Sequence, residues 1–281
     1  MIKRLIIVAI LVAIAAIAGI VRSNSGANLK TIVSHNSAGE SREEIRKSFE
    51  LAPGARVEIF NINGSVNIET SDATVADVFV ERTGSAEALS KRKVVVEGHP
   101  NSLKIYGERA NVGFFARLFG ANSREKVTVK LPRRIDLLTK GVNGSVVVGD
   151  LDGPVEVRGV NGRVQIAGTT GTANFKGING NIFAGLKQLN PEGVTISGVN
   201  GNIELRLSRE LNAYLEAKGM NGRVVSEIMG VSVEKEKRGR YWWVQIGSGG
   251  NSINAKGING NIRLTRTTVT TTATADADEA K

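Results

Sequence analysis

The sequence predicts an all-β fold in which short strands stack in parallel as a solenoid, with two strands and about 18 residues in each coil. Glycines recur every nine residues from Gly144 to Gly180, and alternating apolar pairs such as Val155 and Val157 follow them. Alternation of this kind is typical of a strand with one buried face, and a fixed short period indicates a repeat architecture. The corners before these glycines alternate in kind, so the true repeat is 18 residues.

The corners carry Asn-Gly pairs, which supply the backbone conformations that a tight corner needs. Parallel stacking at about 4.8 Å would place Val155 on Ala173 and Val157 on Phe175, and would join the corner asparagines in a ladder. An antiparallel meander is the alternative, because Asn-Gly between apolar residues is also typical of hairpins, but it gives no reason for alternating corners. The predicted structural corners are Asn63, Gly64, Asn143, Gly144, Asn161, Gly162, Asn179, Gly180, Asn200, Gly201, Asn221, Gly222, Asn259 and Gly260.

Residues 1–21 predict an export signal. Lys3 and Arg4 precede an uncharged apolar run that continues to Val21, whereas a soluble helix would show a polar face. Residues 16–18 fit the small-x-small rule for cleavage, but the run continues beyond them and approaches the roughly 20 residues that a membrane span needs. An uncleaved anchor in the inner membrane is therefore favoured over a cleaved signal peptide, with the body outside the cytoplasm.

The rest of the chain divides by composition. Residues 22–47 are rich in Ser, Asn, Gly and charge, which predicts a flexible linker, with a short helix around Arg42–Ser48 as an option. Residues 48–139 predict an irregular first part of the solenoid and residues 140–266 its regular repeats. Beyond Ile182 the corner spacings are 21, 21 and 38, interpreted as one, one and two successive coils. The Thr/Ala-rich tail 267–281 has little to bury and is predicted to be disordered.

Six strands are expected in the irregular part, and the last four carry charged residues at alternate positions. They are Arg56–Phe60, Ser65–Glu69, Val75–Arg82, Lys93–Gly98, Ser102–Tyr106 and Lys126–Leu131.

The amino-acid composition excludes several classes of function. The chain has no cysteine, which excludes disulfides, thiolate metal sites and a cysteine nucleophile. Its net charge is +10, but the basic residues are interpreted as scattered, without a stripe or an aromatic platform, which argues against nucleic-acid binding. No cofactor or metal is expected, because the corners lack the aspartate of every calcium β-roll repeat and no Gly-x-x-x-x-Gly-Lys phosphate loop occurs.

The candidate catalytic groups are few. His35 and His99 have no partner at motif level, so a Ser-His-Asp arrangement is not expected. Asp150, Asp152 and Glu156 form the best carboxylate cluster, and a glycoside hydrolase needs two such groups. Equivalent positions in neighbouring coils carry no acids, so a solvated turn is favoured over an active site and the chain is not expected to be an enzyme.

Two aromatic features are candidate contact sites: Phe114, Phe115 and Phe119 in one, and Trp242 and Trp243 in the other. The phenylalanine group is interpreted as a cap over an open end of the solenoid, with contact to a bilayer or a partner as the alternative. The tryptophans are neighbours in a predicted strand and must face opposite sides, so one ring is available to stack on a sugar or peptide. Alternatively, it covers the adjacent basic loop by cation–π contact.

Several motifs together resemble a known family. They are an apolar-Pro-Gly opening at Leu51–Gly54, Asn-Gly-x-Val-x-Ile within Asn61–Glu69, Val-x-Leu-Pro at Val129–Pro132, and Gly-Ile-Asn at 177–179 and 257–259. The pattern resembles the bacterial putative-adhesin family of envelope proteins and is similar to the autotransporter-adhesin head domain named for Gly-Ile-Asn. The resemblance covers roughly residues 49–265 and implies a right-handed parallel β-helix presented outside the cytoplasm. Its motifs are structural, so no ligand residue carries over.

The leading hypothesis is a non-enzymatic cell-envelope protein that presents a solenoid surface for adhesion or for contact with envelope polysaccharide or protein. The first alternative is a structural scaffold of solenoids stacked end to end, because uncapped ends can pair strand to strand. The second is a carbohydrate-active enzyme on a β-helix. The sequence leaves the ligand and the oligomeric state open.

Overall fold

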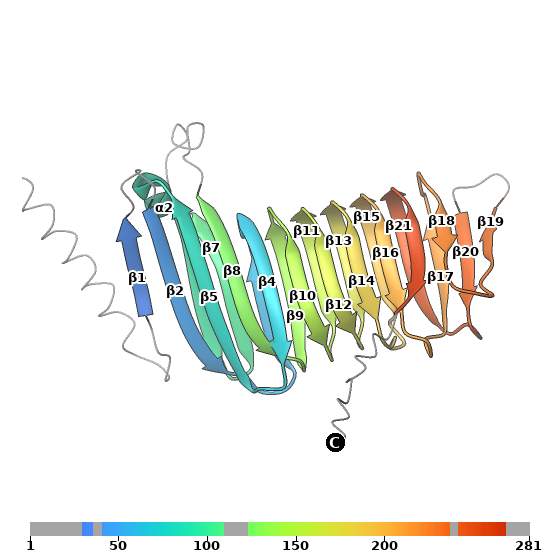
Figure 1. Cartoon of the computed structure of the whole chain (residues 1–281), viewed down its shortest axis with the longest axis horizontal. Helices are drawn as coiled ribbons and strands as arrows, with labels where there is room; N and C mark the ends of the chain where they lie inside the picture. Colours follow the sequence, from blue (N-terminus) through green and yellow to red (C-terminus); the bar gives the residue numbers. More distant parts are fainter. Residues whose placement is uncertain (1–29, 36–40, 110–122, 237–240, 268–281) are drawn as a thin grey trace, which may run out of the picture.

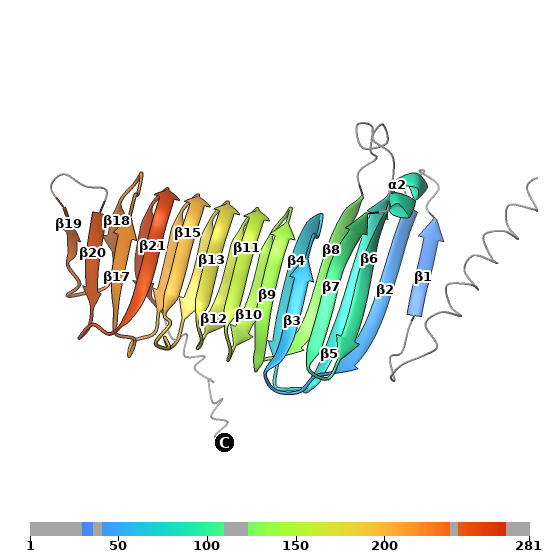
Figure 2. The same ribbon diagram turned by 180° about the vertical axis from the view of Figure 1, so that it is seen from behind.

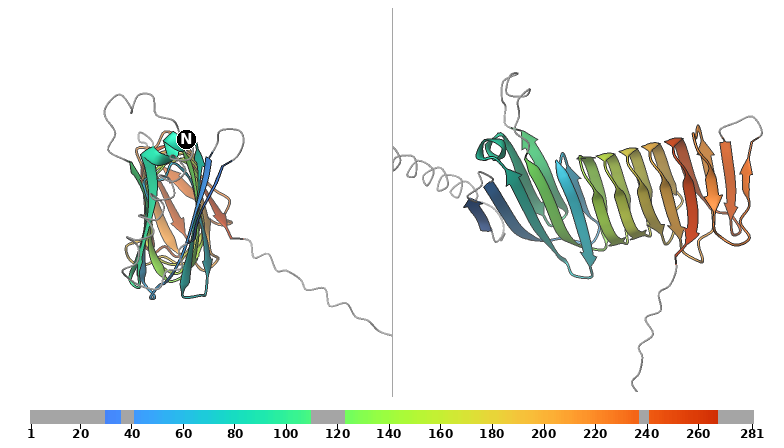
Figure 3. Two further views of the ribbon diagram at one scale, coloured as in Figure 1. Left: turned by 90° about the vertical axis from the view of Figure 1, so that its left-hand side faces the viewer. Right: turned by 45° about the horizontal axis from the view of Figure 1, so that its top comes forward.

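The computed structural model describes residues 30–35, 41–109, 123–236 and 241–267, which form two large β-sheets and one short helix. Each sheet contains 11 strands. The sheets lie face to face, and their strands run across the long axis of the molecule (Figures 1 and 3). The phenylalanine group at 114–119, the predicted anchor at 1–21 and nearly all of the predicted tail lie outside the described residues.

The first sheet, sheet A, mixes antiparallel strands at one end with parallel strands along the rest. Its spatial order is β1 (Lys30–His35), β2 (Ser41–Glu50), β5 (Val75–Gly84), β8 (Arg124–Pro132), β4 (Gly64–Ser71), β10 (Val146–Leu151), β12 (Val164–Thr169), β14 (Ile182–Leu186), β16 (Ile203–Leu207), β22 (Ile262–Arg266) and β18 (Val224–Ser226).

The second sheet, sheet B, has antiparallel strands at both ends. Its spatial order is β19 (Val233–Lys235), β20 (Tyr241–Ile246), β17 (Ala213–Lys218), β21 (Asn251–Asn259), β15 (Val194–Asn200), β13 (Ala173–Asn179), β11 (Val155–Asn161), β9 (Ile135–Val142), β3 (Ala55–Phe60), β7 (Ser102–Arg109) and β6 (Arg92–His99).

In the central coils the chain passes from one sheet to the other with each successive strand. Strand β11 pairs in parallel with β13, and the register joins Val155 to Ala173 and Val157 to Phe175, as the 18-residue period predicts. An antiparallel meander therefore does not describe these coils. Their alternating apolar side chains point between the sheets, where Phe175 is 1% exposed. Full burial of one such side chain stabilises the fold by about 1.5–3 kcal/mol.

The C-terminal coils do not follow the chain order that the corner spacings predict. Strands β21 and β22 pair in parallel with β15 and β16 on one side, and with β17 and β18 on the other. The last coil therefore lies between two earlier ones, as the position of β21 between β15 and β17 shows (Figure 2). The prediction of successive coils is wrong here because β20 pairs antiparallel with the outer edge of β17, which leaves its inner edge for β21.

The N-terminal end is built from longer antiparallel strands. Strand β2 pairs with β5 over ten residues and also carries β1 on its other edge. The linker prediction for 22–47 is therefore wrong at Lys30–His35 and from Ser41 onward, and the optional helix at Arg42–Ser48 is also wrong. Ser41, Ile45 and Phe49 lie on the inward face of β2 and Arg42 and Arg46 are exposed, while the ten-residue ladder with β5 makes the segment a strand.

The described helix is short and belongs to this same end. Helix α2 (Ala86–Lys91) begins after Ser85, whose hydroxyl accepts a hydrogen bond from the Ala88 backbone N–H. No helix among the described residues has the length and apolar character required to cross a bilayer.

Candidate functional site

The corner asparagines form a continuous chain of hydrogen bonds along one edge of the coils. Each side-chain Nδ2 donates to the Oδ1 of the next asparagine toward Asn63, over 3.0–3.1 Å. The donors in spatial order are Asn221, Asn259, Asn200, Asn179, Asn161 and Asn143. All six amides point the same way, so their dipoles add along the edge.

Glycines on both sides of each asparagine allow this stacking. Gly159 precedes one corner with a φ of 59°, a conformation that side chains disfavour, and Asn61 fills the equivalent place in the first coil with a φ of 57°. Gly162 follows the corner asparagine, and a Cβ there would lie 2.3 Å from the backbone oxygen of Gly144. Close backbone contact between neighbouring coils therefore requires the glycines of the Gly-x-Asn-Gly motif.

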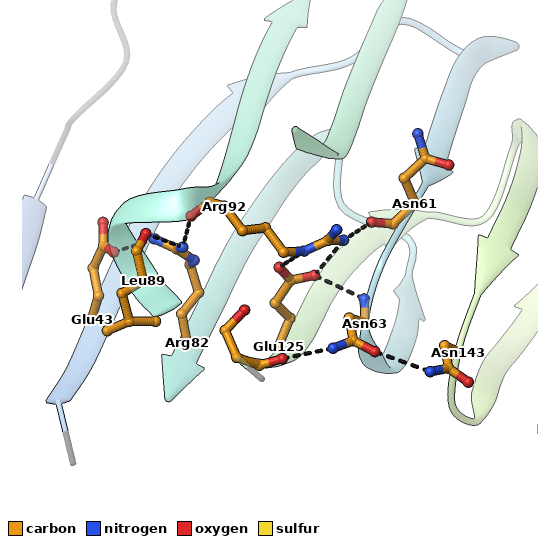
Figure 4. A network of polar contacts seen from close by, with 9 residues as sticks. Glu43, Asn61, Asn63, Arg82, Leu89, Arg92, Glu125 and Asn143 are labelled. Carbon is orange, nitrogen blue, oxygen red and sulfur yellow. Dashed lines mark hydrogen bonds and ion pairs between the residues drawn. The ribbon is translucent and has the colours of Figure 1, made fainter. Parts of the chain in front are cut away.

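The asparagine chain ends at a buried ion pair near the N-terminal end (Figure 4). Asn63 donates from Nδ2 to the Ser123 backbone oxygen at 2.7 Å and from its backbone N–H to the Glu125 carboxylate at 2.9 Å. Glu125 is 1% exposed and pairs with Arg92, which also donates to the Asn61 backbone oxygen. The negative Glu125 carboxylate lies at the end of the asparagine chain toward which the amide N–H groups point. Its charge therefore complements the summed dipole of the asparagine amides.

A second buried cation joins this end of the two sheets. Arg82 is 2% exposed; it pairs with Glu43 and donates to the backbone oxygens of Leu89 (2.9 Å) and Arg92. Every buried charge in Figure 4 has a partner of opposite sign or a carbonyl. We therefore interpret the network as structural, because breaking one such pair leaves an uncompensated buried charge.

A polar hollow of about 910 Å³ lies beside this network. It is lined by Asn63, Gly64, Ser65, Glu81, Thr83, Gly84, Ser123, Arg124, Glu125, Lys126, Asn143, Gly144 and Ser145. None of these side chains is apolar, whereas small-molecule sites are mostly apolar with a few placed polar groups. The hollow does not have the character of a small-molecule site.

The acidic residues singled out in the sequence do not converge. Asp150 lies in sheet A, 2.9 Å from Lys187 Nζ, whereas Glu156 lies in sheet B beside Arg158. Asp152 lines a hollow of about 110 Å³, below the roughly 300 Å³ of ordinary ligand pockets.

The two tryptophans face opposite sides of β20. Trp242 packs against the core, and Lys235 Nζ lies 5.0 Å from its ring. Trp243 lies on the outer face, stacked on Tyr214 with 5.5 Å between ring centroids. Trp243 and Tyr241 also line a hollow of about 570 Å³. The outer face of sheet B therefore ends in an aromatic platform, which we define as Tyr214, Tyr241 and Trp243.

A charged pair lies beside this platform. Lys218 Nζ contacts the Glu216 carboxylate at 2.9 Å and lies 5.4 Å from the ring centroid of Tyr241. The hydrogen bond between them lowers the pKa of Glu216 and raises the pKa of Lys218. Partial desolvation and the negative charge of Glu216 raise the pKa of Tyr241.

Basic residues form a row across sheet B that the sequence reasoning missed. The strand registers connect Lys140, Arg158, Lys176, Ser197, Lys256 and Lys218 in one line across six neighbouring strands. The five cations of this line, defined here as the cation row, are all exposed. The prediction that basic residues are scattered without a stripe is wrong for this face.

A signal for the row was present in the sequence. Each cation directly precedes the first glycine of a corner, as in Lys140-Gly141 and Arg158-Gly159. Alignment of the repeats by their corners would have placed these cations in register, because parallel stacking puts equivalent positions side by side.

Comparisons with known proteins give distant structural likenesses. No family model matches the chain, and no curated protein matches it. A crystal structure of a putative cell adhesion protein from Clostridium sporogenes is 17% identical over 80% of this chain and 100% of that one, with a TM-score of 0.39.

Two further solved structures come from Parabacteroides. A putative adhesin from Parabacteroides merdae is 13% identical over 80% of this chain and 96% of that one, with a TM-score of 0.29. A putative lipid binding protein from Parabacteroides distasonis is 12% identical over 80% and 97%, with a TM-score of 0.24. With TM-scores this low, no residue role is transferred from them, and the resemblance to the autotransporter head domain stays a prediction.

Proposed function

We propose that the chain is a non-catalytic protein of the bacterial cell envelope that presents a β-solenoid surface for adhesion or for contact with envelope polymers. The observation that carries the proposal is the outer face of sheet B. Its parallel strands present exposed polar and charged side chains in register, from β9 to β17, and the face ends in the aromatic platform. A long surface of this kind suits an extended partner better than a small molecule.

The proposal includes the handedness and the location that the sequence predicts. The coils are those of a right-handed parallel β-helix, anchored in the inner membrane through residues 1–21 with the body outside the cytoplasm. The supporting observation for the location is the apolar run that follows Lys3 and Arg4.

The acidic residues support a non-catalytic role. Asp150 is held by Lys187 and also lies 3.8 Å from Arg133, so its carboxylate is occupied by cations. Glu156 is in the other sheet. A glycoside hydrolase needs two carboxyl groups about 5–10 Å apart across one sugar. Asp152 shares its small hollow with Asp72, but Asp72 lies 3.1 Å from Arg133 and the hollow of about 110 Å³ is smaller than an ordinary ligand pocket.

The C-terminal edges of the sheets favour surface contact over end-to-end stacking. The C-terminal edge strands β18 and β19 have three residues each, and short edge strands resist pairing with another chain. At the other end, the Lys47 ammonium donates to the Val96 backbone oxygen of edge strand β6 at 2.8 Å.

The test is a binding screen with the full chain in detergent micelles. Immobilised peptidoglycan, an acidic polysaccharide, a neutral polysaccharide and anionic lipid vesicles are offered at two salt concentrations. We expect saturable binding to at least one polymer and a molecular mass that stays constant as protein concentration rises. Growth of the mass with concentration would favour the scaffold alternative, and absence of binding to every polymer would refute the proposal.

A further inference from the structure

We propose that the cation row is a binding track for an acidic polysaccharide that lies along the stacking axis of the coils. The inference rests on the proposed function and names the class of polymer that sheet B would contact. The row crosses β9, β11, β13, β15, β21 and β17, which lie side by side in that order (Figure 2). Adjacent strands are about 4.8 Å apart, so the row is roughly 24 Å long.

The fold itself does not need this row. Like charges that are direct neighbours across strands destabilise a sheet, yet Lys140, Arg158 and Lys176 occupy three successive strands in register. Arg158 pairs with Glu156 on its own strand, as Lys218 does with Glu216. Within the described part of the chain, Lys140, Lys176 and Lys256 have no ion pair. An external polyanion would supply the missing counter-charges.

The neighbouring side chains favour a sugar polymer. The line of outward residues beside the row begins at Leu138 and continues in register with Glu156, Asn174, Thr195, Asn254 and Glu216. Carboxylate, amide and hydroxyl groups of this kind exchange hydrogen bonds with sugar hydroxyls. A polysaccharide places such hydroxyls between its charges, so it can satisfy both lines of side chains at once.

Aromatic rings lie at both ends of the row. At one end Lys218 pairs with Tyr241 of the aromatic platform. At the other, Lys140 pairs with Phe60, which stacks on Tyr106 with ring centroids 4.9 Å apart. These rings offer apolar faces on which sugar rings can stack.

Nucleic acid fits this face less well. Each strand of a B-form duplex brings a phosphate about every 3.4 Å along the helix axis, a denser charge than one cation per β-strand can match. Glu156 and Glu216, next to the row, would face those phosphates and repel them.

The test compares two triple variants of the full chain in detergent micelles. Lys140→Gln, Lys176→Gln and Lys256→Gln together remove the unpaired part of the row. The matched control removes the same charge elsewhere on the surface, through Lys130→Gln, Arg209→Gln and Arg223→Gln. All six side chains are exposed. Thermal melting of both variants verifies that the fold is intact.

Affinity is measured for polygalacturonate oligomers of defined length, for dextran as a neutral polymer and for single-stranded DNA. We expect the row variant to bind polygalacturonate at least about tenfold more weakly than the unsubstituted chain, and the control variant to change by less than about threefold. Affinity should rise with oligomer length until the oligomer spans the row, and dextran should bind far more weakly.

Each other outcome has a definite meaning. Equal losses in both variants would show that net charge acts alone, and tighter binding of DNA would assign the row to nucleic acid; either result overturns the inference. If the unsubstituted chain binds peptidoglycan or a neutral polysaccharide but not polygalacturonate, the inference fails while the proposed function stands. If no polymer binds, both fail.

Discussion

Thr139 and Thr169 are two fully buried threonines for which the structure predicts opposite responses to the same substitution. Both side chains are 0% exposed. The hydroxyl of Thr139 has no hydrogen-bond partner among the described residues. The hydroxyl of Thr169 donates to the Gly153 backbone oxygen at 3.0 Å and accepts from the Gly171 backbone N–H at 3.3 Å.

Substitution of Thr139 by valine should stabilise the fold. Its strand neighbours in register are Ile59 and Val157, so the added methyl group meets apolar side chains. An unsatisfied hydroxyl costs about 1–3 kcal/mol, and valine keeps the volume and the strand preference. We expect the free energy of unfolding to rise by about 1–2 kcal/mol. For a chain of this size the melting temperature would rise by about 3–6 °C.

Thr169→Val is the matched control. It removes two hydrogen bonds and leaves a carbonyl and an N–H without their partner, which should lower the free energy of unfolding by about 1–3 kcal/mol. Thermal and denaturant unfolding of the full chain, with circular dichroism as the readout, measures both variants in one buffer. The reasoning is refuted if Thr139→Val destabilises the protein, or if both substitutions shift stability in the same direction.

Three other comparisons test the corners and one half-buried amine. Gly162→Ala should destabilise the fold by several kcal/mol because its Cβ meets a backbone oxygen, whereas Gly54→Ala, with nothing within 4 Å, should cost only about 1–2 kcal/mol; comparable melting curves would contradict this. Asn161→Asp puts a carboxylate against the Asn143 side-chain oxygen, which raises the pKa of the new carboxyl group in the folded chain. The free energy of unfolding of this variant should therefore fall as pH rises through that pKa. Asn161→Ala should show no such pH dependence. Burial lowers the pKa of Lys47 in the folded chain below 10.5, its value in the unfolded chain. Between the folded and the unfolded pKa the unfolded chain binds more protons, so the free energy of unfolding rises with pH. Lys47→Met should remove that rise, which denaturant unfolding at several pH values measures.

The central coils could be predicted because their signal is local. The nine-residue glycine period and the apolar alternation determine strand length, corner and register together, and Val155 pairs with Ala173 as expected. The same local signal could not reveal which edge of a coil a later strand would join. Asn259 was therefore expected to follow Asn221 in space, whereas it lies between Asn200 and Asn221.

Other features escaped because they depend on distant residues. Strand β2 has exposed charged residues such as Arg42 and Arg46, which made its sequence resemble a linker. The ion pair of Arg92 with Glu125 joins residues 33 positions apart, and no motif marks it. The cation row, by contrast, was within reach of an alignment of the corners.

The position of β21 and β22 has a consequence for synthesis of the protein. The strands of the penultimate coil, β17 and β18, leave the ribosome well before the coil that separates them from β15 and β16. Residues 251–266 supply the strand partners for the facing edges of β15, β16, β17 and β18, so these edges have no partner from this coil until the residues are synthesised. The final segment pairs with these edges from within, so a chain truncated after residue 250 would lose an interior layer. Thr267 then leaves the body beside β16, where its N–H donates to the Leu207 oxygen at 2.9 Å, and any following segment starts from the flank of the molecule (Figure 1).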